Sequence, residues 1–322
     1  MVIAEIGNNH EGSAAVASEL VRKAADCKVD VIKFQVFRTD RYISRNDPKR
    51  FAQLKRYELA PEIFIELAGE ARSLGLGVVA TALDRESAIA LAPHMDGLKI
   101  ASGDLGYFPL VDLMLTYGKP LILSTGLSDL KKVAKTIDRV RESWGEATPG
   151  LLAILHCVSA YPAPPEQANL SAIQSLKTRF GVETGYSDHT IGITAAIAAV
   201  AMGARIIEKH FTLANDYSDF RDHQLSADPG TMTELVERVR QIDIMLGDGV
   251  KAIQPNEVPI QAAVARSLAV NFDREAGDIL LADDVSWVRC GNGVPYGAAD
   301  PVGKRLTRKV SAGASLSDSD FE

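Results

Sequence analysis

The chain has 322 residues, enough to bury a large core, and its 46% hydrophobic and 24% charged residues are the composition of an ordinary soluble globular protein. Its formal net charge of −7 and its pI of about 5.5 exclude an overall basic surface for nucleic acid or for an anionic membrane. Any anionic ligand must therefore be bound by a few well-placed lysines or arginines.

The sequence carries no clear targeting or membrane signal. The N-terminus has no basic segment and reaches Glu5 after three apolar residues, so it does not predict a signal peptide. The longest near-apolar run, 191–204, is too short to span a bilayer. Cys27, Cys157 and Cys290 lack the spacing of a disulfide framework or a thiolate metal site. We therefore expect a cytoplasmic protein without a nucleic-acid or membrane partner.

Apolar, β-rich runs alternate with helical patterns through most of the chain. The helical patterns include 13–28, 61–75, 128–144 and 230–248. The apolar runs are nearly continuous, as expected of parallel strands that are buried on both faces. We predict strands at 2–7, 30–37, 77–83, 97–104, 120–126, 151–159, 182–189 and 204–211.

Eight strand–helix units within about 250 residues predict an α/β fold of the (β/α)₈ or TIM-barrel type, although a doubly wound open sheet gives the same local pattern. The polar residues favour the barrel, because they gather at strand C-terminal ends and a barrel brings all these ends to one mouth. They are Glu5, Lys33, Gln35, Thr81, Lys99, Ser102, Asp104, Ser124, Thr125, His156, Ser187, His189, Glu208 and His210.

Two connections are longer than usual for loops that follow strands. The segment 38–60 carries seven basic residues, and the segment 212–229 is acidic and rich in turn residues. Because both segments follow strands, we expect both to lie over the mouth of the barrel. They are either solvated surface or parts that contact substrate, and the sequence leaves both interpretations open.

The sequence pattern changes after Gly249. We predict a catalytic barrel domain over 1–250, a linker over 251–264 and a small β-rich domain over 265–322. A domain of about 58 residues is only marginally stable alone. We therefore expect it to dock on a barrel, either its own or that of a partner.

Lysines in predicted core strands indicate a binding site. Because a lysine is seldom buried without a partner, Lys33 and Lys99 predict either a shared anionic ligand or internal carboxylates such as Glu5 and Glu208. We favour the ligand, since nearby serines and strand-to-helix turns can provide hydroxyl and amide donors for a phosphate. These serines are Ser102, Ser124 and Ser187.

His189 and His210 end two successive strands, which brings two imidazoles to the same edge of the sheet. A lone histidine at a strand end is more often a structural residue, but a pair suits a divalent metal. Together with carboxylates at Glu5, Asp104 and Asp222, these groups suit bond formation between a phosphorylated enol and a metal-polarised carbonyl. No dinucleotide-binding or Walker A motif is present in the sequence.

Seven motifs occur in order: Ala-Glu-Ile-Gly-Asn-Asn-His-Glu-Gly-Ser (4–13), Val-Ile-Lys-Phe-Gln (31–35), Lys-Ile-Ala-Ser-Gly-Asp (99–104), Leu-Ser-Thr-Gly (123–126), Leu-His-Cys-Val-Ser-Ala-Tyr-Pro (155–162), Gly-Tyr-Ser-Asp-His-Thr (185–190) and Glu-Lys-His-Phe-Thr (208–212). This series resembles the sialic acid synthase family, whose members condense phosphoenolpyruvate with an N-acylated hexosamine such as N-acetylmannosamine. The C-terminal part resembles the antifreeze-like, or SAF, domain of that family.

The resemblance implies a reaction and a metal. The enol C3 attacks the sugar aldehyde, water adds to C2, and phosphate leaves by C–O cleavage to give a nine-carbon 2-keto-3-deoxy acid. His189 and His210 match the ligands of the metal, for which we expect Mn²⁺, with Mg²⁺ or Co²⁺ as alternatives. Catalytic positions are implied for Glu5, which orients or deprotonates water, and for Lys33, Gln35, Lys99 and Asp222. Substrate contacts are implied for Ser102, Asp104, Ser124, Ser159, Tyr161, Ser187 and Arg289.

Two positions depart from the family pattern. Asp104 stands where the best-known members carry glutamate, so contacts to the acylated sugar can differ. The family's SAF domain supplies an arginine to the neighbouring subunit from an Arg-Pro-Gly-Asn-Gly-like turn, whereas this chain has the shorter Val-Arg-Cys-Gly-Asn-Gly. We expect Arg289 to be the shifted equivalent and the protein to be a domain-swapped homodimer.

Two alternative functions remain open. One is a phosphoenolpyruvate-dependent synthase that acts on a sugar phosphate, with a second phosphate site supplied by 38–60. The other is a catalytically inactive carbohydrate-binding homologue, although the retained charges would be costly in a core that does not use them. Within the favoured function, the acceptor is N-acetylmannosamine or a precursor of legionaminic or pseudaminic acid, a choice that one acetamido contact can decide.

Overall fold

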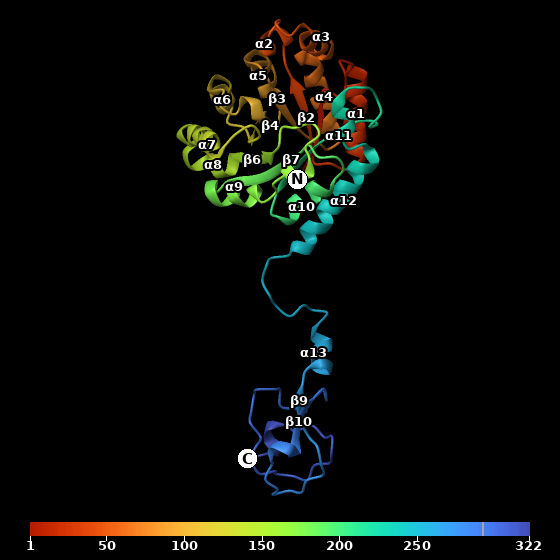
Figure 1. The fold of residues 1–322 in the computed structure, drawn as a ribbon, viewed down its shortest axis with the longest axis vertical. Coiled ribbons are helices and arrows are strands. Elements are labelled where there is room, and N and C mark those ends of the chain that lie inside the picture. Colours follow the sequence, from red (N-terminus) through yellow and green to blue (C-terminus); the bar gives the residue numbers. More distant parts are fainter. Residues whose placement is uncertain (292) are drawn as a thin grey trace. The chain divides into compact units, whose positions relative to one another are not determined.

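The computed structural model describes residues 1–291 and 293–322, which divide into two compact units, 1–247 and 248–322. The first unit is a closed barrel of eight parallel strands in the order β1 to β8, surrounded by helices (Figure 1). Because β8 pairs with β1, the predicted TIM barrel is confirmed and the open sheet is excluded. The strands are β1 Val2–Gly7, β2 Val31–Val36, β3 Gly77–Ala82, β4 Gly97–Ile100, β5 Leu121–Ser124, β6 Leu152–Cys157, β7 Glu183–Asp188 and β8 Ile206–His210.

The strands occupy the predicted runs, but several end earlier than expected. The largest difference is at β4, which ends at Ile100 instead of residue 104. The chain turns there into a short 3₁₀ helix, Ser102–Asp104, in which the Asp104 N–H donates to the Ala101 carbonyl at 3.0 Å. This turn moves Ser102 and Asp104 out of the strand and onto the rim of the barrel.

The strand register places the polar side chains in one layer. Glu5 is the register partner of Lys33 on β2 and of His210 on β8. Ser187 on β7 is in turn the partner of Glu208 on β8. Side chains two residues apart on a strand share a face, so Glu208 and His210 both face the interior of the barrel.

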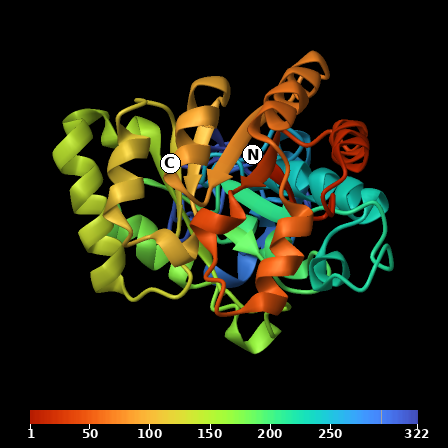
Figure 2. The same ribbon diagram turned by 90° about the horizontal axis from the view of Figure 1, so that it is seen from above.

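The outer helices complete the barrel and shield its strands. α12 packs against α1 and α10 and so closes the ring, and Figure 2 shows α1 (red) beside α12 (cyan). Side-chain caps begin several of these helices; Asp228, for example, accepts the Thr231 N–H at 2.8 Å in front of α12. The helices are α1 Ala14–Asp26, α4 Pro61–Ser73, α5 Arg85–Leu91, α6 Phe108–Leu115, α7 Leu130–Trp144, α8 Thr148–Leu151, α9 Ala172–Phe180, α10 Thr194–Ala201 and α12 Pro229–Leu246.

The two long connections contain helices that the sequence did not predict. The segment 38–60 forms α2 (Thr39–Tyr42) and α3 (Pro48–Tyr57), and the segment 212–229 contains α11 (Arg221–Leu225). Both segments contribute side chains to the central cavity, which confirms that they lie over the mouth of the barrel. These side chains include Tyr42, Arg50, Leu54, Phe220 and Arg221.

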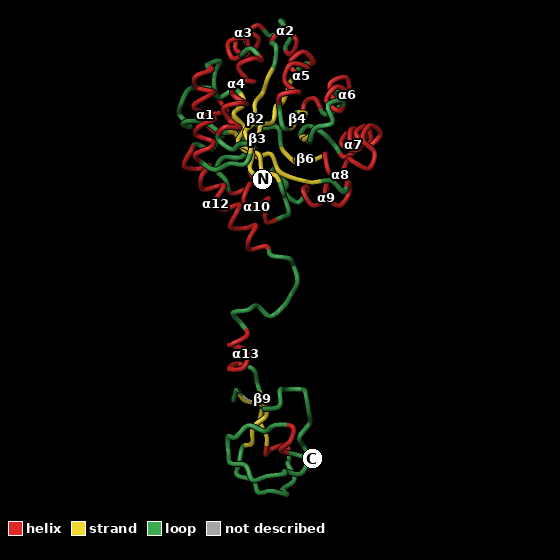
Figure 3. The backbone as a smooth tube through the Cα atoms, turned by 180° about the vertical axis from the view of Figure 1, so that it is seen from behind, coloured by secondary structure: helices red, strands yellow, loops and turns green. Residues whose placement is uncertain are grey.

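The second unit has its own small core. It contains α13 (Val258–Val264), inside the segment predicted as a linker, and an antiparallel two-stranded sheet of β9 (Ser267–Val270) and β10 (Val285–Val288). Much of its remaining chain forms loops and turns (Figure 3). No helix among the described residues has the length and hydropathy needed to cross a membrane. The core side chains are Leu268, Val270, Leu280, Val294, Leu306, Val310, Leu316 and Phe321.

Candidate active site

A cavity of about 900 Å³ opens at the C-terminal mouth of the barrel. Its lining includes every barrel residue to which the sequence assigned a role: Glu5, Lys33, Gln35, Lys99, Ser102, Asp104, Ser124, Ser159, Tyr161, Ser187, His189, His210 and Asp222. Arg289 belongs to the second unit, where it is exposed directly after β10. Asn292, between two glycines in the sequence, lies outside the described residues.

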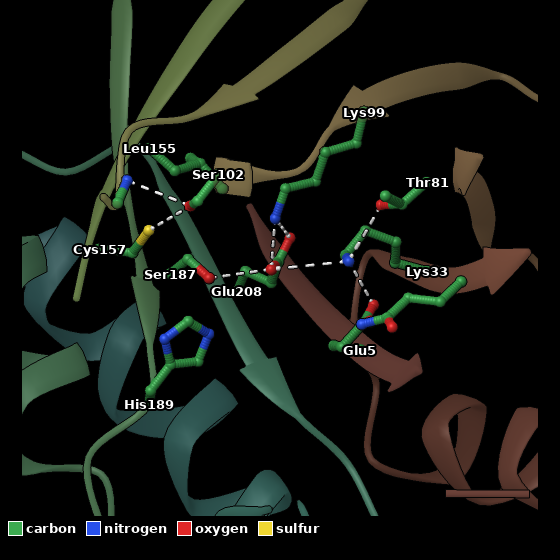
Figure 4. Close-up of polar contacts among 12 residues, drawn as sticks. Glu5, Lys33, Thr81, Lys99, Ser102, Leu155, Cys157, Ser187, His189 and Glu208 are labelled. Carbon is green, nitrogen blue, oxygen red and sulfur yellow. Dashed lines mark hydrogen bonds and ion pairs between the residues drawn. The ribbon is translucent and has the colours of Figure 1, made fainter. Parts of the chain in front are cut away.

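The floor of the cavity is a charge quartet made of Glu5, Lys33, Lys99 and Glu208. The Lys33 ammonium lies 2.6 Å from Glu5 and 3.7 Å from Glu208. The Lys99 ammonium lies 2.6 and 2.7 Å from the two oxygens of Glu208, so that Glu208 is placed between the two lysines (Figure 4). Both lysines pair with the internal carboxylates that the sequence offered as one of the two alternatives. A buried ammonium needs a counter-charge close by, and these carboxylates provide it.

The two carboxyl groups of the quartet have pKa shifts in opposite directions. Burial raises the pKa of Glu5, and the nearby Lys33 ammonium offsets this effect only in part. Burial also disfavours the charged form of Glu208, but Lys33 and Lys99 outweigh it and lower the pKa of Glu208. Glu5 is therefore suited to exchanging a proton, whereas Glu208 is suited to remaining a fixed anion.

Serine side chains and a backbone amide gather on one side of the cavity. The Gly126 N–H donates to the Ser102 hydroxyl at 3.1 Å, and the Cys157 sulfur also lies 3.1 Å from that hydroxyl. A Cβ at position 126 would lie 2.4 Å from the Ser159 hydroxyl, so only glycine fits there. The buried Ser124 hydroxyl has no hydrogen-bond partner within the described part of the chain. It is therefore available to a ligand.

The two histidines face each other, with ring centroids 5.6 Å apart. His189 Nδ1 lies 2.7 Å from the Val158 carbonyl, which can only accept, so Nδ1 carries a proton and Nε2 is the acceptor nitrogen of the neutral ring. His210 Nδ1 is buried and has no hydrogen-bond partner among residues 1–291 and 293–322. Burial lowers the pKa of both histidines and favours the neutral form that binds metals.

The donor set therefore fits a divalent metal that takes two ligands from the chain. The described residues contain no group of three or more His, Cys, Asp or Glu side chains that could hold a metal ion. A metal at His189 and His210 would need oxygen ligands from water or substrate to complete its coordination. The Tyr161 ring packs against this pair. Its centroid lies 4.3 Å from the centroid of the His189 ring and 5.9 Å from that of the His210 ring.

Asp222 enters the cavity from the segment that contains α11. Its Oδ1 is buried and forms an ion pair with Arg221, whose Nε lies 3.4 Å away, without a hydrogen bond from the described residues. Burial raises the pKa of Asp222, although the adjacent Arg221 opposes this shift. The Arg221 guanidinium also lies over the Tyr161 ring at 5.2 Å. A carboxylate oxygen that accepts no hydrogen bond within the described residues is suited to accepting one from a substrate hydroxyl.

A buried contact holds the segment of Asp222 against the loop that follows β1. His223 Nε2 lies 3.1 Å from Glu11, and His223 Nδ1 lies 2.6 Å from the Thr212 hydroxyl. The Asn215 amide donates to the His223 carbonyl at 2.9 Å. The position of Asp222 therefore depends on its neighbour His223.

Sequence reasoning missed several lining residues. Glu208 was named as a possible internal partner of the buried lysines but was not included among the site residues. Its spacing of two residues from His210 was the signal that places both on the same face. Tyr42, Arg50 and Phe220 also line the cavity. They come from the long connections, where no periodic pattern marks the inward-facing positions.

Comparisons with known proteins match both parts of the chain. The NeuB family model matches residues 20–251. The chain is 37% identical over 330 residues to N,N'-diacetyllegionaminic acid synthase from Legionella pneumophila, covering 98% of this chain and 92% of that protein. It is 31% identical over 323 residues to N-acetylneuraminate-9-phosphate synthase from Homo sapiens, covering 95% and 88%. The solved structure of N-acetylneuraminic acid (sialic acid) synthetase from Leptospira borgpetersenii, in complex with citrate, superposes with a TM-score of 0.76 at 32% identity, covering 80% of this chain and 89% of that chain.

Proposed function

Because the chain belongs to the NeuB family of synthases, we propose that it condenses phosphoenolpyruvate with an N-acylated hexosamine and water, giving a nine-carbon 2-keto-3-deoxy acid and phosphate. The observation that carries this proposal is one cavity that joins the buried lysines Lys33 and Lys99 to the facing imidazoles of His189 and His210. Such a cavity can hold a small, highly charged anion next to an activated carbonyl group.

Phosphoenolpyruvate binds, in this proposal, between the lysines and the serine side of the cavity. The ammonium groups of Lys33 and Lys99 provide charged donors, and the open Ser124 hydroxyl provides a neutral one. The formal charges of the quartet cancel, so the incoming anion is not attracted by an excess of positive charge at the floor. We therefore propose that anion and metal bind cooperatively, because the charge of each offsets that of the other.

His189 and His210 hold the divalent metal in this proposal, for which we propose Mn²⁺, with Mg²⁺ or Co²⁺ as alternatives. When bound, the metal supplies Lewis-acid polarisation of the sugar aldehyde. Stacking of Tyr161 on His189, and of Arg221 on Tyr161, restricts the His189 ring. The chain thereby presents an oriented, neutral imidazole to the site.

Glu5 is our candidate for the group that orients and deprotonates the water that adds to C2. Gln35 Nε2 donates to one oxygen of Glu5 at 2.6 Å, and Lys33 lies 2.6 Å from the other. These two bonds fix the carboxylate, and its raised pKa lets it take up a proton. Asp222 is our candidate for a sugar contact, since its Oδ1, which pairs with Arg221 but accepts no hydrogen bond from the described residues, can accept one from a hydroxyl.

We propose an acceptor without a phosphate group. Four basic side chains of 38–60 form ion pairs with carboxylates: Arg41 with Glu86, Arg45 with Asp40, Lys55 with Glu58 and Arg56 with Glu11. Besides the quartet, the described residues that line the cavity include the cations Lys49, Arg50 and Arg221 and the anions Asp47, Asp104, Asp219 and Asp222. This balance does not favour a second phosphate. The apolar wall of Tyr42, Leu54, Leu83 and Phe220 suits the methyl of an acetamido group.

A phosphate-release assay tests the proposed reaction. The enzyme is incubated with phosphoenolpyruvate, Mn²⁺ and a panel of N-acylated hexosamines, alongside His189→Ala and His210→Ala. Release that depends on one sugar and is lost in both variants supports the proposal and identifies the acceptor. Release with a phosphorylated sugar instead would support the sugar-phosphate alternative. The observation that favours this alternative is that Lys49 and Arg50 line the cavity. Failure to bind either phosphoenolpyruvate or Mn²⁺ would favour a carbohydrate-binding protein.

We also propose a cytoplasmic, domain-swapped homodimer in which Arg289, on a SAF-like domain, reaches the partner's site. Large apolar side chains are exposed between residues 244 and 260, where a second copy could cover them: Ile244, Met245, Val250, Ile253, Val258 and Ile260. Sedimentation at the mass of a monomer would contradict this assembly. In a mixture of Arg289→Ala with His189→Ala, recovery of activity above either variant alone would support exchange of the arm between subunits.

A further inference from the structure

Asp188 and Lys209 form a buried ion pair directly behind the two histidines. Asp188 precedes His189 and Lys209 precedes His210, and the two are register partners on β7 and β8. Asp188 is 0% and Lys209 1% exposed, and the Lys209 ammonium donates to Asp188 Oδ2 at 2.9 Å. Because side chains alternate along a strand, this pair lies on the face of the sheet opposite to the cavity. It therefore contacts neither the proposed substrate nor the proposed metal.

Thr190 extends this pair into a cluster that encloses the backbone of His189. Asp188 Oδ1 accepts the Thr190 N–H at 2.9 Å and the Thr190 hydroxyl at 2.8 Å. The Lys209 ammonium also donates to the Thr190 carbonyl. One ammonium thus contacts the residues on both sides of His189, and it belongs to the residue next to His210.

His189 needs such support, because it lies one residue beyond the end of β7. The β7–β8 register pairs end at Asp188 and Lys209, so the strand ladder does not fix the next residue. The Ala163 N–H donates to the His189 carbonyl at 2.9 Å, and the cluster provides the further bonds around this position. His210, in contrast, is the last residue of β8 and is held by pairing with β1.

The pair is not required to fill the space behind the strands. One step earlier on the same face, the register partners are Tyr186 and Ile207, each 1% exposed. The Tyr186 ring and the Ile207 side chain therefore pack well between these strands and the outer helices, and the Tyr186 hydroxyl donates a hydrogen bond to Asp188. Apolar residues can often replace a buried ion pair without loss of stability, so stability alone does not explain a charged pair at this level.

We propose that the cluster of Asp188, Thr190 and Lys209 is a positioning device that sets the spacing and orientation of His189 relative to His210. Its consequence is the affinity of the two-imidazole site for a divalent cation. The inference rests on the metal site of the proposed function. It assigns a role to three residues that do not line the cavity.

The test measures Mn²⁺ binding to the full-length protein by the loss of the free-ion EPR signal. Thr190→Val removes one hydrogen bond and keeps the side-chain shape, whereas Thr190→Ser keeps the hydroxyl. The double variant Asp188→Asn with Lys209→Met removes the ion pair without leaving a buried unpaired charge. We expect Thr190→Val and the double variant to weaken Mn²⁺ binding about tenfold or more, as for other residues that orient metal ligands. Thr190→Ser should bind almost as tightly as the wild type.

Two controls separate positioning from general destabilisation and from failure of the metal site. Ile207→Ala creates a cavity on the same face of β8, and it should lower the melting temperature without changing Mn²⁺ affinity. Binding of inorganic phosphate should be the same in Thr190→Val as in the wild type. If His189→Ala abolishes Mn²⁺ binding while Thr190→Val and the double variant bind normally, the positioning role is wrong. If His189→Ala binds Mn²⁺ like the wild type, the metal site is wrong, and the inference with it.

Discussion

The Lys99 ammonium and the Glu208 carboxylate form a bidentate contact, at 2.6 and 2.7 Å, in the floor of the cavity. Both side chains are almost completely buried, and Lys33 lies on the other side of Glu208 at 3.7 Å. Glu208 therefore occupies the position between two cations that an anionic ligand would otherwise take. Its carboxylate keeps the lysines paired and also limits how strongly the floor attracts an anion.

Glu208→Gln should strengthen anion binding while weakening the fold. The substitution changes the formal charge of the quartet from zero to +1, so we expect inorganic phosphate to bind about tenfold more tightly, as measured by calorimetry. Loss of the buried partner should lower the free energy of unfolding by roughly 3–5 kcal/mol. Glu70→Gln is the control, because Glu70 pairs with Arg22 at the surface, where the expected change is roughly 1 kcal/mol or less. Unchanged phosphate affinity in Glu208→Gln would contradict this account of the floor.

The sequence predicted the barrel and the part of the cavity lining that lies at the strand ends, because buried parallel strands leave continuous apolar runs whose polar ends stand out. Membership of the sialic acid synthase family, predicted from the motifs, is confirmed by the NeuB match. The sequence offered internal carboxylates such as Glu208 as one alternative for the lysines but did not decide that Lys99 pairs with Glu208, since this depends on distances between strands far apart in sequence. Tyr42 and Arg50 were missed for a related reason. Their segment has no apolar repeat, and contacts such as Tyr57 against Phe220, at 5.1 Å, place it over the cavity.

Asp104→Glu should change the choice of acceptor sugar. Asp104 lines the outer cavity, and burial raises the pKa of its carboxyl group. One added methylene moves the carboxyl group toward the substrate, so we expect the ratio of kcat/KM values between two N-acylated hexosamines to change by about tenfold. Asp104→Asn keeps the side-chain length and removes the charge. Comparing it with Asp104→Glu separates the effect of side-chain length from the effect of charge. Equal ratios in the wild type and both variants would show that Asp104 does not contact the part in which the sugars differ.

His10 should make the barrel less stable in mild acid. It is 1% exposed, its Nδ1 accepts the Gly12 N–H at 3.0 Å, and burial lowers its pKa to about 4. The unfolded chain takes up this proton near pH 6.5, so the stability provided by neutral His10 is complete above about pH 6.5 and is lost as the pH falls to about 4. The total loss should be roughly 3 kcal/mol.

Urea unfolding between about pH 4 and about pH 7 measures this effect in the wild type and in His10→Gln, which keeps an acceptor but does not titrate. As the pH is lowered, the free energy of unfolding should fall more steeply in the wild type than in His10→Gln. His94→Gln, at an exposed position, should follow the wild type. Parallel pH profiles for the wild type and His10→Gln would show that His10 takes up its proton equally in the folded and unfolded chain.

His223→Ala should weaken sugar binding without weakening phosphoenolpyruvate binding. His223 connects Glu11 and Thr212, at 3.1 and 2.6 Å, and so fixes the segment that presents Asp222 to the cavity. Without this contact, Asp222 loses its fixed position, so we expect the KM for the sugar to rise about tenfold. The KM for phosphoenolpyruvate should stay nearly constant, because the proposed anion donors Lys33, Lys99 and Ser124 lie on β2, β4 and β5, away from the contacts of His223. His94→Ala is the matched control at the surface. An equal rise in both KM values would instead indicate general loosening of the barrel mouth and would contradict a specific role for His223.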